Sequence, residues 1–194
     1  SAIWAVYRQL CAAALHVLAI HRHAGVGDRA APFLERARQR LAGASESDLP
    51  EIQAWRRAFA SMGIKPTQYR CAWEALLRRL RKEGSMPPLH PLIELCNAVS
   101  MAYAIPVAVL DAQRLGSALE VRYADGTERY LTFGGDTEHP EPGEVTYADP
   151  EGRAHARRWT NRQSGLSAVH DDTREVLIVA GALQDGAGRA LAGL

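Results

Sequence analysis

Residues Leu92 to Asp111 read LIELCNAVSMAYAIPVAVLD, and this stretch decides the fold of the second half of the chain. Apolar residues at helical spacing predict a helix over Leu89 to Tyr103. Pro106 interrupts that pattern, and Pro106 to Leu110 form a short apolar run that is typical of a strand. Asp111 is suited to cap the turn that follows. The helix side chains that we expect to face inward are Leu92, Leu95, Cys96 and Val99.

After Asp111 the sequence predicts a series of strands. Ala118 to Tyr123 and Glu128 to Phe133 flank an Ala124-Asp125-Gly126-Thr127 turn. This pattern indicates a hairpin, because Asp-Gly supplies the positive backbone angles of a tight turn. Residues 134–143 are rich in proline and glycine and predict a loop. Further strands are predicted over Val145–Ala148, Ala154–Trp159 and Val176–Ala180.

Before Leu89 the sequence predicts mostly helices. Residues 13–20 form an apolar run that predicts a buried strand, with a short helix as the alternative. One helix is predicted over residues 30–41, and another begins at Pro50, with Ser47 or Asp48 as its cap, and stops at Gly63. A third runs over residues 68–82 and ends at Gly84.

Helices precede strands without a regular alternation, which predicts one α+β domain over residues 1–194, a mainly antiparallel sheet packed with helices. Trp55 and Trp73 fall at inward helix positions and are expected in its core. Two helices around a turn also occur in helix-turn-helix readers of DNA. The connection from Met62 to Thr67 contains Pro66 and is too long and irregular for that motif, so we expect no DNA partner.

The composition is typical of a soluble globular protein, with 47% hydrophobic and 23% charged residues among 194. The longest apolar runs are too short to span a bilayer. Residues 1–20 lack the basic leader and the cleavage site of a signal peptide. We therefore expect a cytoplasmic protein with no membrane partner.

The sequence predicts no metal site and no cofactor. Its cysteines are far apart and odd in number, which indicates neither a disulfide framework nor a metal knuckle. They are Cys11, Cys71 and Cys96. The one close set of histidines is followed by no further ligand at a recognisable spacing. It comprises His16, His21 and His23. Gly25-Val26-Gly27 lacks the third glycine of a dinucleotide fingerprint.

Arginines are clustered along the first half of the chain, although the net charge is only +1. Such runs are common on solvated helix faces, and they also bind the phosphates of nucleic acid. Both interpretations stay open for the run on the predicted helix over residues 68–82. If RNA binds there, the expected contacts are Arg78, Arg79 and Arg81.

The order and spacing of several polar residues resemble those of a known family. Asn97 lies nine residues before Pro106 and fourteen before Asp111, and a turn-rich region leads to the WTNRQS sequence at 159–164. This pattern resembles the tRNA-editing (B3/B4) domain of the phenylalanyl-tRNA synthetase beta subunit. It is more similar still to the stand-alone proteins that carry this domain alone. The resemblance covers Trp55 to Ala182.

The resemblance implies a pocket in which several family residues are replaced. Asn97 keeps the asparagine of the family, while Cys96 stands in place of the threonine before it. Ala108 occupies the position of the family's catalytic-site histidine, and Val179 that of its glutamate. The family's two glycines fall on residues 160 and 161, and its Ser-Gly on residues 164 and 165.

On this basis the expected catalytic residues are Asn97, Thr160 and Asn161. The expected substrate-binding residues are Cys96, Asp111, Glu120, Trp159, Arg162 and Ser164. Structural alternatives stay open: Asn97 as a buried amide that caps a neighbouring loop, Asp111 as a turn cap, and 160–164 as an ordinary polar turn. An inward carboxylate at Glu120 would favour a cationic substrate side chain.

The resemblance implies a trans-editing aminoacyl-tRNA deacylase whose partner is a mischarged tRNA. Such an enzyme hydrolyses the aminoacyl ester with water positioned by the pocket and the substrate, without a covalent intermediate. The implied substrate carries a noncognate aromatic amino acid, or an arginine analogue such as canavanine on tRNA-Arg. The missing histidine and glutamate favour one alternative, a non-catalytic tRNA- or protein-binding module with the same fold. An unrelated small-molecule-binding protein with a polar cleft is the second alternative.

Overall fold

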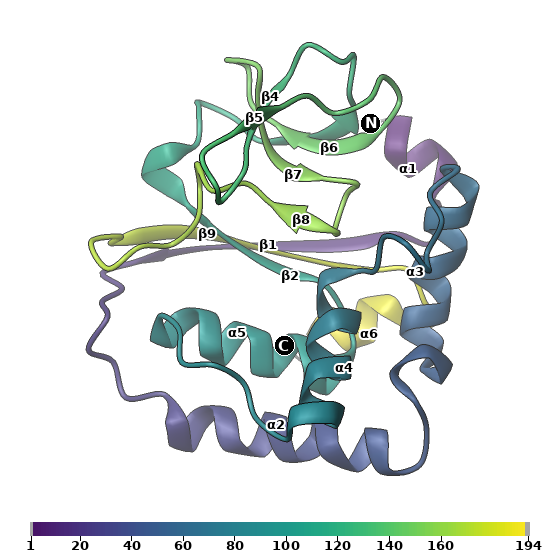
Figure 1. The fold of residues 1–194 in the computed structure, drawn as a ribbon, viewed down its shortest axis with the longest axis vertical. Helices are drawn as coiled ribbons and strands as arrows, with labels where there is room; N and C mark the ends of the chain where they lie inside the picture. The colour runs from purple at the N-terminus through teal and green to yellow at the C-terminus, as the bar shows by residue number, and fades with distance from the viewer. Residues whose placement is uncertain (1, 193–194) are drawn as a thin grey trace.

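The structure of the protein is a computed structural model that describes residues 2–192. It is an α+β fold, as the sequence predicts, but its strands form two sheets and not the single sheet that was expected. The smaller sheet is antiparallel, with the order β1-β9-β2 and continuous pairing. Its strands are β1 (Cys11–Leu18), β9 (Glu175–Ala182) and β2 (Val107–Asp111). In Figure 1 this sheet crosses the middle of the molecule.

The larger sheet lies above the smaller one in Figure 1 and has the order β3-β6-β7-β4-β5, with β8 paired to β7. All its neighbours are antiparallel except β4 and β7. Its strands are β3 (Glu120–Tyr123), β4 (Arg129–Leu131), β5 (Thr137–Glu138), β6 (Val145–Ala148), β7 (Arg153–Arg157) and β8 (Arg162–Gln163).

The predicted hairpin between β3 and β4 is wrong, because these two strands are not neighbours in the sheet. The predicted tight turn does form: Gly126 has φ +96° and the Asp125 carboxylate accepts from Thr127 N at 2.8 Å. Glu128 explains why the turn does not lead into a hairpin. Its fully buried carboxylate accepts from Asp125 N and Gly126 N at 3.2 and 3.1 Å and from Arg122. The turn closes around this carboxylate, and the chain then leaves toward β7.

Four longer helices lie beside and below the smaller sheet (Figure 1), with α2 packed along α5. They are α2 (Gly27–Ala42), α3 (Pro50–Ser61), α4 (Ala72–Glu83) and α5 (Pro91–Tyr103), and short helices α1 (Ala2–Val6) and α6 (Ala187–Ala192) lie near the two ends. As predicted, α4 is followed by a left-handed glycine, Gly84 at φ +71°.

Helix α3 begins at Pro50, as predicted, but its predicted cap is wrong. Neither Ser47 nor Asp48 caps α3, whose N-cap is Leu49 without a side-chain hydrogen bond. Asp48 instead accepts from the backbone and the hydroxyl of Ser45, at 3.1 and 2.7 Å, around the 3-10 turn Glu46–Asp48.

Helix α4 begins at Ala72, four residues after the predicted start at Gln68. Tertiary bonds take the backbone groups at this point, because Ala72 N donates to Thr160 O and the Asn161 amide donates to Arg70 O, at 3.0 and 2.6 Å. The β7–β8 connection therefore fixes where α4 starts.

Three tryptophans form the centre of the core between α3, α4 and the β7–β8 connection. Trp55 lies edge-on to Trp73 and to Trp159, with ring centroids 5.4 and 4.8 Å apart. Trp55 and Trp73 are buried, as predicted. Arg158 and Trp159 both adopt left-handed backbone angles, φ 48° and 59°. Non-glycine residues rarely adopt such angles, so packing of the indole holds this turn in place.

Two predictions about burial are wrong. The strand at residues 13–20 forms as β1, but it is an edge strand and most of its side chains are exposed, including Leu15 and Leu18. On α5 the fully buried apolar residues are Ala98, Met101 and Ala102. The four side chains expected inward there are only half-buried and lie along a hollow beside the smaller sheet. Helix α5 thus carries apolar residues on two faces.

Candidate functional site

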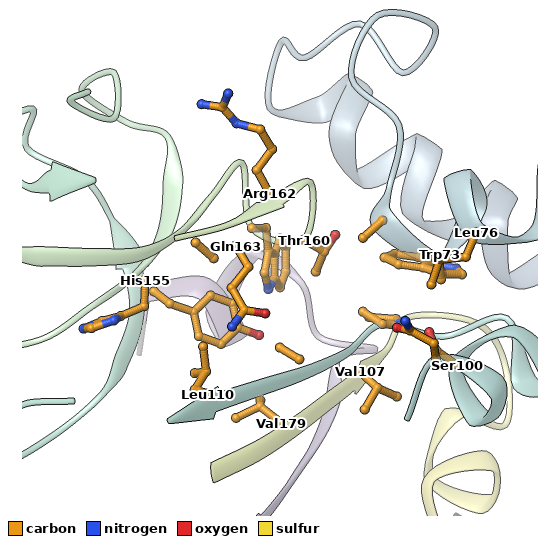
Figure 2. A pocket seen from close by; sticks show the side chains of 17 residues that line it. Trp73, Leu76, Ser100, Val107, Leu110, His155, Thr160, Arg162, Gln163 and Val179 are labelled. Atoms are coloured by element: carbon orange, nitrogen blue, oxygen red, sulfur yellow. The ribbon is translucent and has the colours of Figure 1, made fainter. Parts of the chain in front are cut away.

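A cavity of about 90 Å³ lies where α4 and α5 meet the two sheets. We call it the Asn97 cavity (Figure 2). Much of its wall is apolar and comes from α4, β2 and β9: Trp73, Leu76, Val107, Leu110 and Val179. Its polar side comes from α5, β6, the β7–β8 connection and β8: Asn97, Tyr147, Thr160, Arg162 and Gln163. Concave sites with few polar groups are typical of ligand pockets.

Asn97 is half-buried on α5 and borders the cavity. Its side-chain amide makes no hydrogen bond to any residue in the part of the chain that the structure describes, so it caps no loop there. The next polar residue on this face, Ser100, is already used, since its hydroxyl donates to Ile105 O at 2.5 Å. Enclosed amides are normally hydrogen-bonded. Asn97 is therefore a polar group of the cavity that is free to bind a ligand.

Thr160 also lines the cavity, through the left-handed turn that Trp159 anchors. Its hydroxyl is buried and has no oxygen or nitrogen partner among residues 2–192. It interacts with the thiol of Cys71, whose pKa is raised by burial. Within this wall Thr160 can donate to or accept from a molecule in the cavity.

The neighbouring Asn161 lies outside the cavity wall, because its amide donates to Arg70 O and secures the start of α4. Trp159 lines the cavity and belongs to the tryptophan core. Arg162 lines the rim and its guanidinium points away from the cavity in Figure 2. This guanidinium donates to Glu138 and lies over the ring of Tyr130.

The other predicted substrate-binding residues are separate from the cavity. The Asp111 carboxylate accepts from Gln113 N at 3.0 Å and from the Thr173 hydroxyl at 2.8 Å, so it is the predicted turn cap. Ser164 is buried and donates to Leu131 O. Cys96 lies along the hollow beside the smaller sheet, where burial raises its pKa to about 11. Glu120 is exposed on β3.

The two positions that the sequence resemblance assigns to histidine and glutamate do meet in the cavity. Ala108 and Val179 are cross-strand partners on β2 and β9, and both line its wall. Neither side chain can accept a proton. The register of β2 and β9 therefore brings two apolar side chains together at this part of the wall.

Sequence reasoning missed Gln163 and Tyr147, which line the cavity from β8 and β6. The Gln163 amide donates to Val109 O at 2.8 Å and to Ser167 O at 3.3 Å, which leaves its carbonyl oxygen to accept. Burial raises the pKa of Tyr147 to about 12, so its phenol stays protonated. The polar run at 159–164 was a usable signal for Gln163. No local signal marks Tyr147, because its position depends on the pairing of β6 with β3 and β7.

His155 borders the cavity through its β7 position, but its fully buried ring points away from it (Figure 2). The ring nitrogens bond to the Asp149 carboxylate at 2.9 Å and to the Ser167 hydroxyl at 3.0 Å. Burial lowers the pKa of His155, against the opposing effect of Asp149. This group therefore supports the wall and is closed to solvent.

The predicted phosphate-binding arginines all have carboxylate partners. Arg81 and Arg78 share the buried Glu46, at 2.7 and 3.6 Å, and Arg79 pairs with Glu83 at 2.8 Å. All three side chains are more than 40% exposed. Two guanidinium groups on one carboxylate leave an excess of positive charge on the solvent side of α4.

Among residues 2–192 no group of three or more histidine, cysteine, aspartate or glutamate side chains is placed to hold a metal ion. His16 is instead paired with Glu175 at 2.6 Å across β1 and β9. No helix in the same range is long and apolar enough to cross a membrane.

This fold and its cavity define an α+β protein with a small cavity where helices meet two sheets. The family model of the B3/4 domain matches residues 54–191, which include every residue of the Asn97 cavity. The chain belongs to the B3/4 domain family.

A solved structure in the comparison is the N-terminal fragment of the phenylalanyl-tRNA synthetase beta-subunit from Pyrococcus horikoshii. It is 13% identical over 53% of this chain and 39% of that chain, with a TM-score of 0.41. The alignment therefore spans well under half the length of that fragment. The search of curated proteins found no match.

Proposed function

We propose that this protein hydrolyses the ester bond of a mischarged aminoacyl-tRNA in trans and releases the amino acid and the intact tRNA. The observation that carries the proposal is the unpartnered amide of Asn97 at an enclosed cavity in a B3/4 domain. Membership of the family indicates a tRNA-related role, and the cavity offers a place for the aminoacyl group. The tRNA partner and a cytoplasmic location are parts of the same proposal.

The chemistry rests on positioning, because the aminoacyl ester is already activated. In this proposal Asn97 contacts the amino group or the terminal ribose, while Thr160 and the Gln163 carbonyl oxygen hold the attacking water. Each positioned polar group of this kind contributes on the order of tenfold to a thousandfold. Among the described residues that line the cavity, no carboxylate is present and the His155 ring is turned away. The substrate's own hydroxyl and amino groups therefore complete the site, without a covalent intermediate.

Two substrate classes belong to the proposal: a noncognate aromatic amino acid, or an arginine analogue such as canavanine on tRNA-Arg. The uncharged lining and the rim position of Arg162 favour a side chain without positive charge. The volume of about 90 Å³ is below the roughly 150 Å³ of a cavity known to admit benzene. An aromatic side chain thus requires the cavity wall to move, whereas a small side chain enters directly.

The test is deacylation of a panel of charged tRNAs by the purified protein, with aromatic, small aliphatic and arginine-analogue esters side by side. We expect turnover on at least one ester, lowered by at least about tenfold in Asn97→Ala. Asn161→Ala is the matched control, because it removes a neighbouring amide that serves the backbone. No turnover on any ester at high enzyme concentration would contradict the proposal.

The second candidate is a non-catalytic tRNA- or protein-binding module with the same fold. The observation in its favour is the apolar pair Ala108 and Val179 at the positions of the family's histidine and glutamate. It predicts tRNA binding that is unchanged in Asn97→Ala, without turnover on any ester.

A further inference from the structure

The Asn97 cavity adjoins a second and larger hollow of about 400 Å³ between α2, α4, α5 and the segment Ser85–Leu89. We call it the α2 hollow. Asn97 borders both spaces. On α4, Leu76 lines the cavity and Leu80 lines the hollow. Leu76 and Leu80 are one turn apart on one helix face, about 6 Å along the axis, so the two spaces follow one another along α4 and share Asn97 as a border.

The α2 hollow has the chemistry of a small-molecule site. Its lining includes the small residues Gly27, Ala30 and Ala31 on α2 and the segment with Met86, Pro87 and Pro88. A few polar groups accompany these apolar walls. Glu94 uses one carboxylate oxygen to accept from Leu89 N at 2.8 Å, and the other has no partner among residues 2–192. Arg38 is half-exposed and donates to Gly84 O at 3.3 Å.

We propose that the α2 hollow binds the 3′-terminal nucleoside of the charged tRNA, an inference that rests on the proposed function. The flat base lies between the α2 wall and the proline segment, and the free oxygen of Glu94 accepts from a hydroxyl or amino group of the nucleoside. The ester then lies at Asn97, and the aminoacyl group enters the Asn97 cavity. Arg38 faces the phosphate that precedes the nucleoside.

Size and charge support this division of the substrate. A volume of about 90 Å³ cannot hold a nucleoside, whereas 400 Å³ is within the roughly 300–1,000 Å³ of small-molecule sites. Arg38 on α2 lines the hollow, and a polyanion gains from its positive charge there. Helix α2 precedes the residues that the family model matches, so this wall lies outside the matched part of the chain.

The first experiment measures binding of adenosine to the purified protein by calorimetry, without any requirement for turnover. For a ligand of this size we expect a Kd on the order of 0.1 mM. Ala31→Phe fills the hollow from its open side, because Ala31 is exposed, and should weaken adenosine at least tenfold. Ala60→Phe is the matched control on an exposed face of α3, away from both spaces, and should leave the Kd unchanged. Absence of binding at millimolar adenosine, or equal binding by Ala31→Phe, overturns the proposal.

The second experiment distinguishes the end of a tRNA from a free nucleoside. Intact tRNA should compete with adenosine, and tRNA that lacks its 3′-terminal nucleotide should not. Equal competition by both tRNAs overturns the proposal. On a charged tRNA that the wild type deacylates, Ala31→Phe should raise KM at least tenfold, and an unchanged KM refutes the nucleoside site while the proposed function stands. If adenosine binds as expected and no ester is hydrolysed, the proposed function fails and the nucleoside site stands.

Discussion

Ala108 on β2 and Val179 on β9 are cross-strand partners, and both line the cavity that Asn97 borders. The sequence resemblance assigns a histidine and a glutamate to these two positions. Because neither alanine nor valine transfers a proton, the proposed hydrolysis would depend on polar groups that hold water and substrate. The same pair makes the wall uncharged, which sets limits on the side chain that the cavity accepts.

Asn97→Ala should lower kcat/KM for deacylation by roughly tenfold to a thousandfold, the range for one positioned polar group. The thermal midpoint should stay close to that of the wild type, because the amide has no hydrogen bond to lose among the described residues. The measurements are single-turnover deacylation and thermal unfolding. Unchanged turnover with unchanged unfolding would remove Asn97 from the site.

Asn161→Ala should have the opposite profile. The variant loses the bond from its amide to Arg70 O, 2.6 Å long, at the start of α4. A hydrogen bond of this kind contributes about 1 kcal/mol to the free energy of unfolding. Denaturant unfolding should show that loss, while kcat per folded molecule changes less than threefold. A large fall in kcat with unchanged stability would move Asn161 into the site.

Much of the architecture follows from local sequence signals. The strand at Val145–Ala148, the strand at β9, the Gly84 helix end and the burial of Trp55 and Trp73 could all be predicted from periodicity and turn residues. The pairing of β3 could not, because the buried Glu128 carboxylate redirects the chain after a correctly predicted turn. Local pattern also gives no information on which strand lies next to another in the sheet.

The candidate site was predictable only in part. Asn97 and Thr160 were found through the sequence resemblance, and the structure places both at one cavity. Asn161 and Ser164 lie close to Thr160 in sequence, but their side chains donate to backbone carbonyl groups instead. Successive side chains in a tight turn point in different directions, so polar residues that are adjacent in sequence can contact different parts of the structure. The contribution of Tyr147 depends on long-range strand register, which no short motif encodes.

Stability should depend on pH through His155. Burial lowers the pKa of this histidine below its ordinary value of 6.5. The unfolded chain therefore binds more protons than the folded one between the folded pKa and 6.5, and stability falls as the pH drops through that window. Thermal unfolding from pH 7.5 to 5 should show this slope in the wild type.

His155→Gln should have a shallower pH slope than the wild type. The slope, and not the absolute midpoint, is the quantity to compare, because the variant also changes the bonds to Asp149 and Ser167. Burial lowers the pKa of His90 too, so His90→Gln is the matched control for the remaining slope. Parallel curves for the wild type and His155→Gln would contradict the assignment.

Deacylation should survive exhaustive treatment with a chelator. Among residues 2–192 no cluster of metal-binding side chains is present, and the proposed chemistry uses positioned water without a Lewis acid. The measurement is single-turnover deacylation before and after dialysis against the chelator. Loss of activity that zinc restores would contradict this expectation, and His16, His21 and His23 would be the first residues to substitute.

Binding of tRNA should depend on the arginines of α4. Substitution of Arg78, Arg79 and Arg81 by glutamine should weaken the binding of all tRNAs alike. It should also flatten the salt dependence of binding, by close to one unit of slope for each phosphate contact on a duplex. The Arg81 guanidinium lowers the pKa of the buried Glu46, so removal of its partners leaves an uncompensated carboxylate. Glu46→Gln is therefore combined with the triple variant, and Glu46→Gln alone is the control. Affinity and salt slope that equal those of the control would show that this run is a solvated face, and Arg157, Arg158 and Arg162 would then be tested in the same way.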